Sequence, residues 1–537
     1  MSTIEKYYLL LPFFLYAETH YSFKGVYSRL KKKEPEVIAD APHRVEPNRP
    51  IPIMLLFKDS HKFPVKVNKV DVEMTNERGI ILQKSFIENT KFIKQKFHSI
   101  IFEIDLPYSI TGLVKINVKF EIETSTSVKS YFNDNYRISS HDPLKVYIAE
   151  QPLPRTSNWY FGDMHYHSSY TEDQAEFGAP LLPSVLLSRA MGLSFFAATD
   201  HSYDLDDDET DYLKNDPGLN KWKKFKQEVS LLNKKFADFV VLPGEEVSAG
   251  NMKNRNVHFL VINDKNFIPG KGDSAEKWFK TKPDLSIYEI LNRIDDEAAA
   301  IAAHPEIRTP LLQWLLIRRG RWRWEDYLHD RLNGMQIWNG AHDRSLTRGL
   351  KRWVDLLLHG KKLFIFAGND AHGNFNRFRQ IGFPFWTFRE LNEQIFGKMR
   401  TGLKIESSLT LKNIIRALKQ GNCIITDGPF VEFTIQNEKR SVVNIGEEIE
   451  GNFFKIEINA QSTPEFGKLE ELKIFYGNMS KKEEKVLQHF NRFDARYTFT
   501  QKQELPSLEK PGYLRLELIS SKNGKEHRCF TNPVWLA

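Results

Sequence analysis

The first 150 residues alternate apolar and polar side chains in the pattern of β-strands that bury one face. Residues 114–122 place Val, Ile, Val, Phe and Ile at every second position, with Lys, Asn or Glu between them. Residues 70–74 repeat this alternation, and an apolar run at 51–57 follows a proline-rich stretch. The pattern predicts a small β-sandwich of immunoglobulin-like type over residues 1–150, without a chemical motif of its own.

Residues 151–402 have a different pattern, because short apolar runs now alternate with stretches of helical periodicity. Helices are expected near residues 182–191, 221–236 and 286–297, with apolar runs between them. Strands that alternate with helices are typical of a parallel sheet covered by helices. Gln151-Pro-Leu-Pro154 predicts the linker into this domain.

The last part of the chain, residues 403–537, returns to short strands after one helix. Ser407 or Ser408 is expected to cap that helix, and Gly421 to end it. Alternating runs at 472–476 and 514–518 then predict strands. We therefore expect a third domain that consists of a helix and a second β-sandwich.

Most apolar runs of the middle region carry a potential metal ligand at or just after their carboxyl end. His165 and His167 lie two apart, so in an extended chain they point to the same side. Taken singly, each histidine is better interpreted as a hydrogen-bonded core residue. Because parallel sheets bring the carboxyl ends of their strands to one edge, the whole series predicts a metal site there. Its later members are Asp200, His201, Glu246, His258, His304, Asp370 and His372.

The order of these motifs resembles that of a known family across about residues 158–390. The motifs are Gly162-Asp-Met-His165-Tyr-His167, Thr199-Asp200-His201, Gly244-Glu-Glu246, His304-Pro305 and Asn369-Asp370-Ala-His372. They are similar to those of the polymerase and histidinol phosphatase (PHP) superfamily of metal-dependent hydrolases, most of all to its carbamate-ester hydrolase branch. The resemblance implies an α/β fold with a distorted (β/α)7 barrel, flanked here by the two β-sandwich domains. It also implies a polynuclear centre of two or three divalent metal ions, such as zinc, manganese or iron.

The resemblance assigns the ligands residue by residue. It gives His165, His167, Glu246 and Asp370 to a first ion, and Glu246, His258 and His304 to a second. A third ion would take Asp173, His201 and His372. Glu245 remains an alternative to Glu246, and Glu172 to Asp173. The candidate catalytic residues are Glu246, Asp370, His201 and Asp200, and either a site histidine or Asp200 would protonate the leaving group. Asp200 and Asn369 would orient imidazoles or simply form turns, and Gln336, a poor metal ligand, is left out.

Composition narrows the substrate only slightly. The 537-residue chain has a net charge of +7 and a pI of about 8.9, which fits an anionic small-molecule ester without requiring one. Arg255, Arg377 and Arg379 lie beside ligand positions and could bind such an anion, although solvated surface charge is the alternative. The function predicted is a metal-dependent hydrolase, with a phosphoesterase first and a carbamate or carboxylic ester hydrolase second. An inactive barrel that binds a polymer or a partner is the third possibility.

The sequence indicates binding partners and cellular compartment less clearly. Cys423 and Cys529 lack metal-ligand spacing, which favours buried thiols in a reducing, cytoplasmic compartment. The apolar run at 7–17 is too short to span a bilayer, and a strand or docked segment is favoured over an export signal. Arg318, Arg319, Arg321 and Arg323, with Trp322 and Trp324, could stack nucleotides, but a helix end with inward tryptophans is the better interpretation. Neither a nucleic acid nor a membrane partner is expected.

Overall fold

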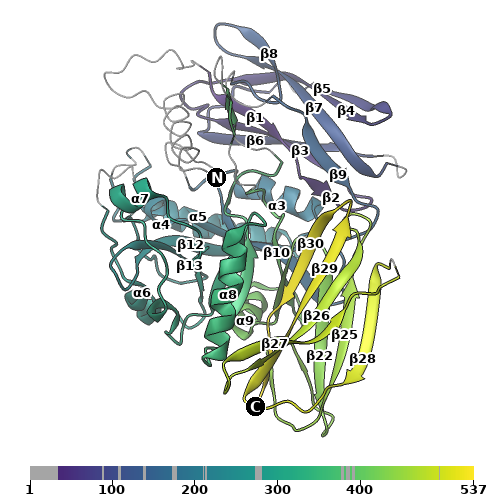
Figure 1. Ribbon diagram of the computed structural model, residues 1–537. Coiled ribbons are helices and arrows are strands. Elements are labelled where there is room, and N and C mark those ends of the chain that lie inside the picture. The colour runs from purple at the N-terminus through teal and green to yellow at the C-terminus, as the bar shows by residue number, and fades with distance from the viewer. Residues whose placement is uncertain are drawn as a thin grey trace. The chain divides into compact units, whose positions relative to one another are not determined.

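The computed structural model (Figure 1) describes residues 34–87, 90–106, 110–136, 141–171, 178–209, 211, 214–272, 281–376, 380–382, 387–389, 394–494 and 496–537. The chain divides into two compact units. Unit 1 comprises Met1–Glu150, His167–Gly192 and Ala371–Phe396, and unit 2 comprises Gln151–Tyr166, Leu193–Asp370 and Gly397–Ala537. The three predicted domains, with boundaries after residues 150 and 402, stay a prediction.

Unit 1 is built on two sheets whose strands pair in antiparallel fashion, except that β2 runs parallel to β9. A three-stranded sheet has the order β1-β3-β6, and a larger sheet has the order β2-β9-β7-β4-β5 with β8 paired to β7. Their apolar faces form one core that includes Leu55, Val72 and Phe120.

The strands predicted at 51–57, 70–74 and 114–122 are confirmed as β3, β4 and β7. The strands are β1 (Glu36–Asp40), β2 (Arg44–Val45), β3 (Ile51–Lys58), β4 (Lys66–Asn76), β5 (Gly79–Ile87), β6 (Phe97–Ile104), β7 (Gly112–Glu123), β8 (Val128–Phe132) and β9 (Leu144–Ile148). Unit 1 also holds α3 (Leu181–Ala190), β17 (Ala371–His372), β18 (Gln380–Gly382) and β19 (Thr387–Arg389).

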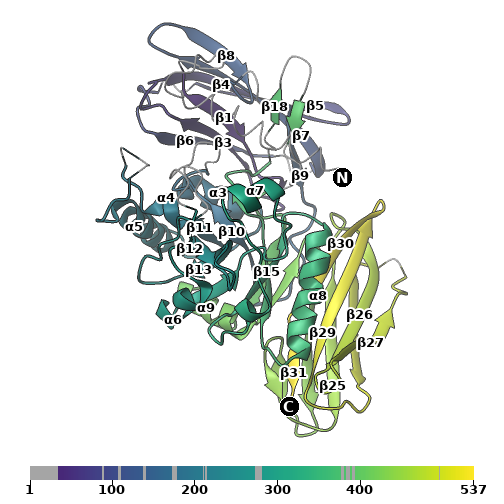
Figure 2. The same ribbon diagram turned by 60° about the vertical axis from the view of Figure 1, so that its left-hand side comes forward.

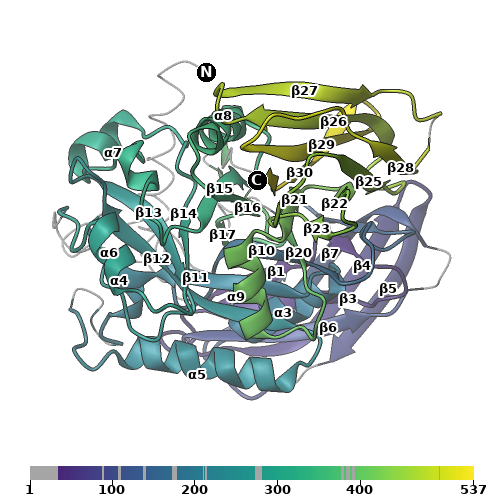
Figure 3. The same ribbon diagram turned by 90° about the horizontal axis from the view of Figure 1, so that it is seen from below.

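Unit 2 is organised around one long curved sheet (Figures 2 and 3). Its path is β16-β15-β14-β13-β12-β11-β10-β20-β21-β30-β29-β26-β27, with β24 and β31 paired at its side. The first strands are β10 (Trp159–His167), β11 (Phe195–His201), β12 (Val240–Gly250), β13 (Asn256–Ile262), β14 (Ala299–Ala302), β15 (Gly334–Asn339) and β16 (Phe364–Gly368). The later strands are β20 (Arg400–Lys404), β21 (Cys423–Thr426), β24 (Glu448–Ile449), β26 (Lys468–Asn478), β27 (Glu483–Phe490), β29 (Gly512–Lys522), β30 (Lys525–Thr531) and β31 (Val534–Leu536).

This sheet corrects the predicted α/β fold with a (β/α)7 barrel. Strand β13 runs antiparallel to both β12 and β14, and β10 pairs with β20 in antiparallel fashion. From β20 the sheet continues into the C-terminal strands, so within the described residues β10 and β16 do not pair to close a ring. The physical reason is that the free edge of β10 hydrogen-bonds to β20, and hydrophobic periodicity reports neither this pairing nor the direction of β13.

A second layer lies against the C-terminal end of the long sheet. The four-stranded sheet β23-β22-β25-β28 packs through β22 onto β29 and β30. Its strands are β22 (Phe430–Asn437), β23 (Val442–Asn444), β25 (Phe454–Gln461) and β28 (Thr498–Glu504). Together the two layers bury Phe433, Ile456 and Leu516, in the manner of the second β-sandwich that alternation predicts for this region.

Helices flank the long sheet because each has one apolar face. Helix α5 (Asn220–Lys235) packs on β12 through Phe225, Val229 and Leu232. Helix α8 (Arg344–Leu358) lies between β15 and the strands β26 and β27 (Figure 2). Helix α9 (Leu411–Gln420) ends at Gly421 as predicted, in a left-handed conformation with φ 70°, but its cap is Thr410 rather than a serine. The shorter helices are α4 (Ser202–Leu205), α6 (Ile287–Arg293), α7 (Leu311–Leu316) and the 3-10 turn η1 (Glu325–Tyr327). Among the described residues, no helix has the length and hydropathy to cross a membrane.

Candidate metal centre

Four predicted ligands come together within unit 2. His165 lies on β10 and Glu246 on β12, while His304 and Asp370 follow the ends of β14 and β16. One nitrogen or oxygen atom from each residue lies within 4.8 Å of the other three. His165 and Glu246 are buried, and the side chain of Asp370 is 17% exposed. The group is therefore an enclosed ligand set that reaches solvent at Asp370.

The distances between these atoms match those between the ligand atoms around one metal ion. His165 Nε2 lies 3.4 Å from Glu246 Oε1 and 3.3 Å from Asp370 Oδ1. His304 Nε2 lies 3.1 Å from Glu246 Oε1 and 3.8 Å from Asp370 Oδ2. Ligand atoms at tetrahedral corners about 2.1 Å from a zinc ion stand ~3.4 Å apart. The four residues thus fit one divalent cation, and histidine with carboxylate suits zinc, manganese or iron.

Two of the four residues have an uncommon backbone conformation. His304 has φ 28° and Asp370 has φ 53°, in the left-handed region that residues with a side chain seldom adopt. The backbone N–H of Asp370 donates to the carbonyl of His165 over 2.8 Å, which holds the turn after β16 against β10. Such strain costs about 1–3 kcal/mol per residue and concentrates at functional sites. The turns therefore direct both side chains toward Glu246 at an energetic cost.

Glu246 is the centre of a wider histidine cluster. Its Oε2 lies 3.1 Å from His201 Nδ1, and its Oε1 lies 2.5 Å from His258 Nδ1. The other ring nitrogen of His258, Nε2, is in contact with Nη1 of Arg319. Arg319 thus lies beside the ligand set, a position that the sequence did not indicate. It follows Ile317 and Arg318, and the backbone pairing of this segment with Asn256 places it there.

The residues that orient His165 were also missed or left out. Gln336 Oε1 lies 2.8 Å from His165 Nδ1, and Gln336 Nε2 donates to Asn339 Oδ1 over 2.9 Å. Asn339 Nδ2 in turn donates to Asp370 Oδ2 over 3.3 Å. An amide oxygen facing Nδ1 favours a proton on that nitrogen and leaves the Nε2 lone pair toward Glu246 and Asp370. Gln336 and Asn339 therefore connect two ligands, although Gln336 is not itself a ligand.

A buried carboxylate fixes the backbone beneath the ligands. Asp163 accepts hydrogen bonds from the backbone N–H of His165, Asn369 and Gly397 and from Asn369 Nδ2, over 2.7–3.1 Å. Burial raises the pKa of Asp163 to about 6, and these donors oppose the rise. Asn369 therefore does contact a carboxylate, but it joins the backbone just before Asp370 to Asp163 and to the backbone of Met399 rather than orienting an imidazole.

Glu245 and Asp200 lie in a different environment from Glu246. Strands β11 and β12 pair Asp200 with Glu245 and His201 with Glu246, so alternation places the first pair on the opposite face from the second. Glu245 accepts from Trp222 Nε1 over 2.8 Å and from the N–H of Ile268 over 3.0 Å. Burial raises the pKa of Glu245 to about 8. Of the two adjacent glutamates, only Glu246 points to the histidines.

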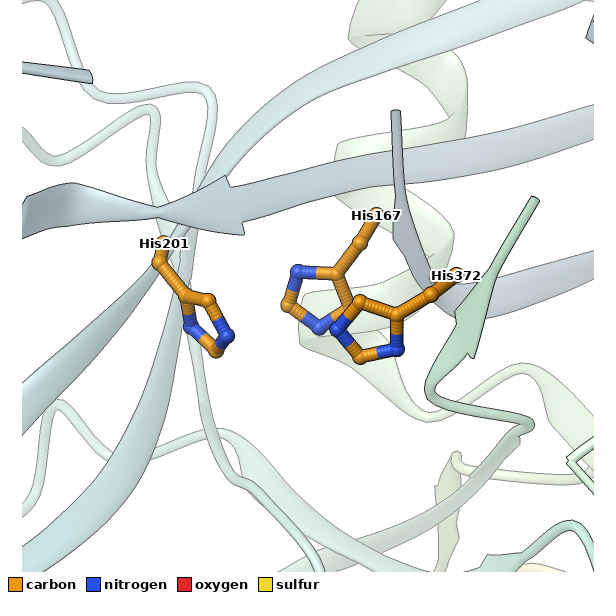
Figure 4. A group of neighbouring side chains, drawn as sticks. All are labelled: His167, His201 and His372. Atoms are coloured by element: carbon orange, nitrogen blue, oxygen red, sulfur yellow. The ribbon is translucent and has the colours of Figure 1, made fainter. Parts of the chain in front are cut away.

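The other predicted residues are not part of this group. His167 and His372 belong to unit 1, where their rings stack with centroids 4.2 Å apart (Figure 4). The third side chain in Figure 4 is His201, which belongs to unit 2 and contacts Glu246 as described above. Asp173, its alternative Glu172, Arg377 and Arg379 lie outside the described residues. Arg255 stacks on Trp314 with its Cζ 4.1 Å from the ring centroid and donates to the Trp314 carbonyl. Trp322 is buried in the core, as expected of a packing residue.

Comparisons with known proteins give no family for this chain. No family model matches it, and no curated protein matches it. A similar solved structure is a glycosyl hydrolase family 2 member from Bacteroides cellulosilyticus, at 10% identity and TM-score 0.18, which covers 93% of this chain and 62% of that one. Another, described as a β-galactosidase from Bacteroides fragilis, has 9% identity and TM-score 0.20, and the match covers 93% of this chain and 73% of that one. A β-glucuronidase from Parabacteroides merdae has 8% identity and TM-score 0.19, and the match covers 94% of this chain and 65% of that one. The chain spans less than two thirds of the first and third of these.

These findings correct the predicted family. The three solved structures named above are glycoside hydrolases and not PHP proteins, and no family model matches the chain. The assignment to the PHP superfamily is therefore wrong, and the phosphoesterase activity and polynuclear centre that came with it are not retained. TM-scores of 0.20 or less carry no argument about activity, so the chemistry rests on the residues alone.

Proposed function

We propose that the protein is a hydrolase that depends on one divalent metal ion held by His165, Glu246, His304 and Asp370. The observation that carries the proposal is the spacing of their ligand atoms, 3.1–3.8 Å, in a largely buried group of side chains on β10 and β12 and just after β14 and β16. Exposed acidic groups often cluster without binding a cation, but His165 and Glu246 are buried and their partners are fixed by further hydrogen bonds. Zinc, manganese and iron all suit this ligand set.

A divalent ion supplies Lewis acidity, which lowers the pKa of a bound water to about 7 in zinc enzymes. The protein's own residues would supply the rest. Glu246 presents Oε1 to the ligand set and Oε2 to His201 Nδ1. Glu246 Oε2 would hold the proton on His201 Nδ1, so a protonated His201 would deliver the proton on Nε2 to a leaving group. Arg319, a fixed cation beside His258, is placed to bind an anionic oxygen of the substrate.

The test compares two neighbouring glutamates. Glu246→Gln should lose at least about 100-fold in metal affinity and in hydrolysis, because it removes the central ligand charge. Glu245→Gln is the matched control, since its side chain points to the other face of β12. Metal content would be measured on chelator-treated protein reloaded with zinc or manganese. Equal behaviour of the two variants would contradict the proposal.

The bond that is cleaved can be found by parallel assays. Nitrophenyl carboxylates, carbamates, phosphates and glycosides would be offered to the apo and reloaded protein. We expect turnover of a carboxylic ester that requires added metal. Glycoside hydrolysis by two carboxylates needs no metal, so activity that resists chelation would indicate that chemistry instead. Tight ligand binding without turnover under any metal would favour a binding protein.

A further inference from the structure

Helix α7 is an exposed apolar segment next to the candidate metal centre. Leu311, Trp314, Leu315 and Leu316 are 60%, 43%, 58% and 57% exposed, although all belong to one six-residue helix. Single exposed apolar residues are common on protein surfaces, but a contiguous group indicates an interaction site. We call these four side chains, with Arg255, Arg308 and Arg318, the α7 surface.

The segment that contains α7 is strongly basic. Residues 307–324 contain five arginines and no aspartate or glutamate. Of the carboxylates that flank this stretch, Glu306 pairs with Arg352 over 3.2 Å, and Asp326 is buried and accepts from the N–H of Met252 and Arg323. Glu325, directly after the stretch, is exposed, so the arginines outnumber the exposed carboxylates beside them. The α7 surface combines leucines, a tryptophan and cations.

The surrounding loop is held in shape. Thr309 Oγ1 donates to the carbonyl of Gly320 over 2.8 Å, which joins the two ends of the loop. Arg255 stacks on Trp314, and Arg318 donates to the carbonyl of Asn254 over 3.2 Å. The neighbouring loop between β12 and β13 adds Met252, 63% exposed, and the exposed Lys253. Apolar side chains are thus presented on a fixed platform with cations at its border.

We propose that the α7 surface binds the anionic face of a lipid bilayer. Leucine and tryptophan enter the boundary between headgroups and acyl chains, and arginines bind lipid phosphates. A protein partner that buries the same leucines would need acidic groups to match the arginines of the α7 surface, whereas an anionic bilayer supplies them everywhere. The segment lies between His304 and Arg319, so docking would bring the candidate centre close to lipid. The inference itself does not depend on the presence of a metal ion.

Sedimentation of the full chain with vesicles tests this inference. We expect binding to phosphatidylcholine vesicles that contain about one third phosphatidylglycerol, and binding at least about tenfold weaker to pure phosphatidylcholine. A rise from about 50 to 500 mM salt should weaken it further, because the shorter Debye length screens the arginines. The double variant Leu315→Ser with Leu316→Ser should lose at least about tenfold, because two half-exposed leucines no longer enter the bilayer.

The matched control is Ile80→Ser with Ile87→Ser on β5, two exposed apolar side chains (61% and 76%) in unit 1. It should bind vesicles like the wild type, and thermal melting should show both double variants folded. Absence of binding to anionic vesicles, or equal loss in both double variants, would overturn the proposal. So would a concentration-dependent dimer that only the α7 variant abolishes, because the surface would then belong to a second copy.

Discussion

His165 and Asp370 are joined twice, by the hydrogen bond from the Asp370 N–H to the His165 carbonyl (2.8 Å) and by the approach of His165 Nε2 to Asp370 Oδ1 (3.3 Å). The first link is made by the backbone and the second by the candidate ligands. Asp370 holds φ 53°, so its replacement can disturb the backbone, the ligand set or both. Substitutions chosen by backbone preference separate the two effects.

Asp370→Asn should keep the fold and lose the metal. Asparagine tolerates the left-handed region as well as aspartate does, so we expect the free energy of unfolding to change by less than about 1 kcal/mol. The amide lacks the ligand charge, and metal affinity should fall at least about 100-fold. Asp370→Val should lose affinity equally and cost a further ~1–3 kcal/mol of stability. Urea unfolding and calorimetric metal titration would measure both; full affinity in Asp370→Asn would exclude Asp370 as a ligand.

The side-chain oxygen of Gln336 should increase metal affinity, because it orients His165. Gln336→Met keeps the side-chain length but removes the acceptor 2.8 Å from His165 Nδ1, which frees the imidazole to rotate or change tautomer. Metal affinity should fall by about tenfold, as for other residues that orient ligands. Gln336→Glu retains an acceptor and should stay within a few-fold of the wild type. Metal titration of the two variants decides the matter, and equal affinities would show that the contact does not orient His165.

Asp163 should stabilise the backbone segments that carry the candidate ligands. Asp163→Asn keeps one oxygen, but its amide group would face the donors Asn369 Nδ2 and Gly397 N–H. Two hydrogen bonds to a buried carboxylate are lost, at about 1.5–3 kcal/mol each. We expect the free energy of unfolding to fall by about 3–5 kcal/mol. Urea unfolding would measure this, with the exposed Glu470→Gln on β26 as a control; a loss below about 1 kcal/mol would contradict the network.

The sequence predicted the apolar strands well because burial on one or two faces leaves a local pattern. It could not give their directions, since an apolar run such as Val257–Ile262 reads the same in a parallel and an antiparallel strand. It also could not show that β20 continues the sheet beyond β10. Arg515 illustrates a related limit: it occupies a polar position of an alternating strand, yet it is buried and pairs with Glu484 because both faces of β29 are covered.

For the candidate centre, the sequence identified ligand residues at the carboxyl ends of strands, but not the residues that contact and orient those ligands. His165, Glu246, His304 and Asp370 stand out because each follows or ends an apolar run. Gln336, Asp163 and Arg319 act through contacts with residues distant in the chain, and none has a local signal. The positive φ of His304 had no signal either, because residues before proline rarely adopt it.

Asp427 should make the protein sensitive to acid. Burial on its own would raise the pKa of its carboxyl group, but hydrogen bonds from His342 Nε2 (2.8 Å) and His527 Nδ1 (3.0 Å) outweigh burial and hold the pKa well below its usual range. A carboxyl whose pKa is lower in the folded than in the unfolded protein stabilises the fold above its unfolded pKa of about 4. That stability is lost as the pH falls from about 4 toward the lower, folded pKa.

The variant Asp427→Asn should therefore be less stable than the wild type by about 3 kcal/mol at pH 7, because it loses charge-assisted hydrogen bonds to a buried carboxylate. The difference should shrink below about pH 4, where the wild-type carboxylate becomes protonated as well. Urea unfolding between about pH 3 and pH 7 would measure the two curves, and the exposed Asp105→Asn would serve as the control with an unchanged slope. Parallel curves for the wild type and Asp427→Asn across this range would show that the two histidines do not stabilise the charged form.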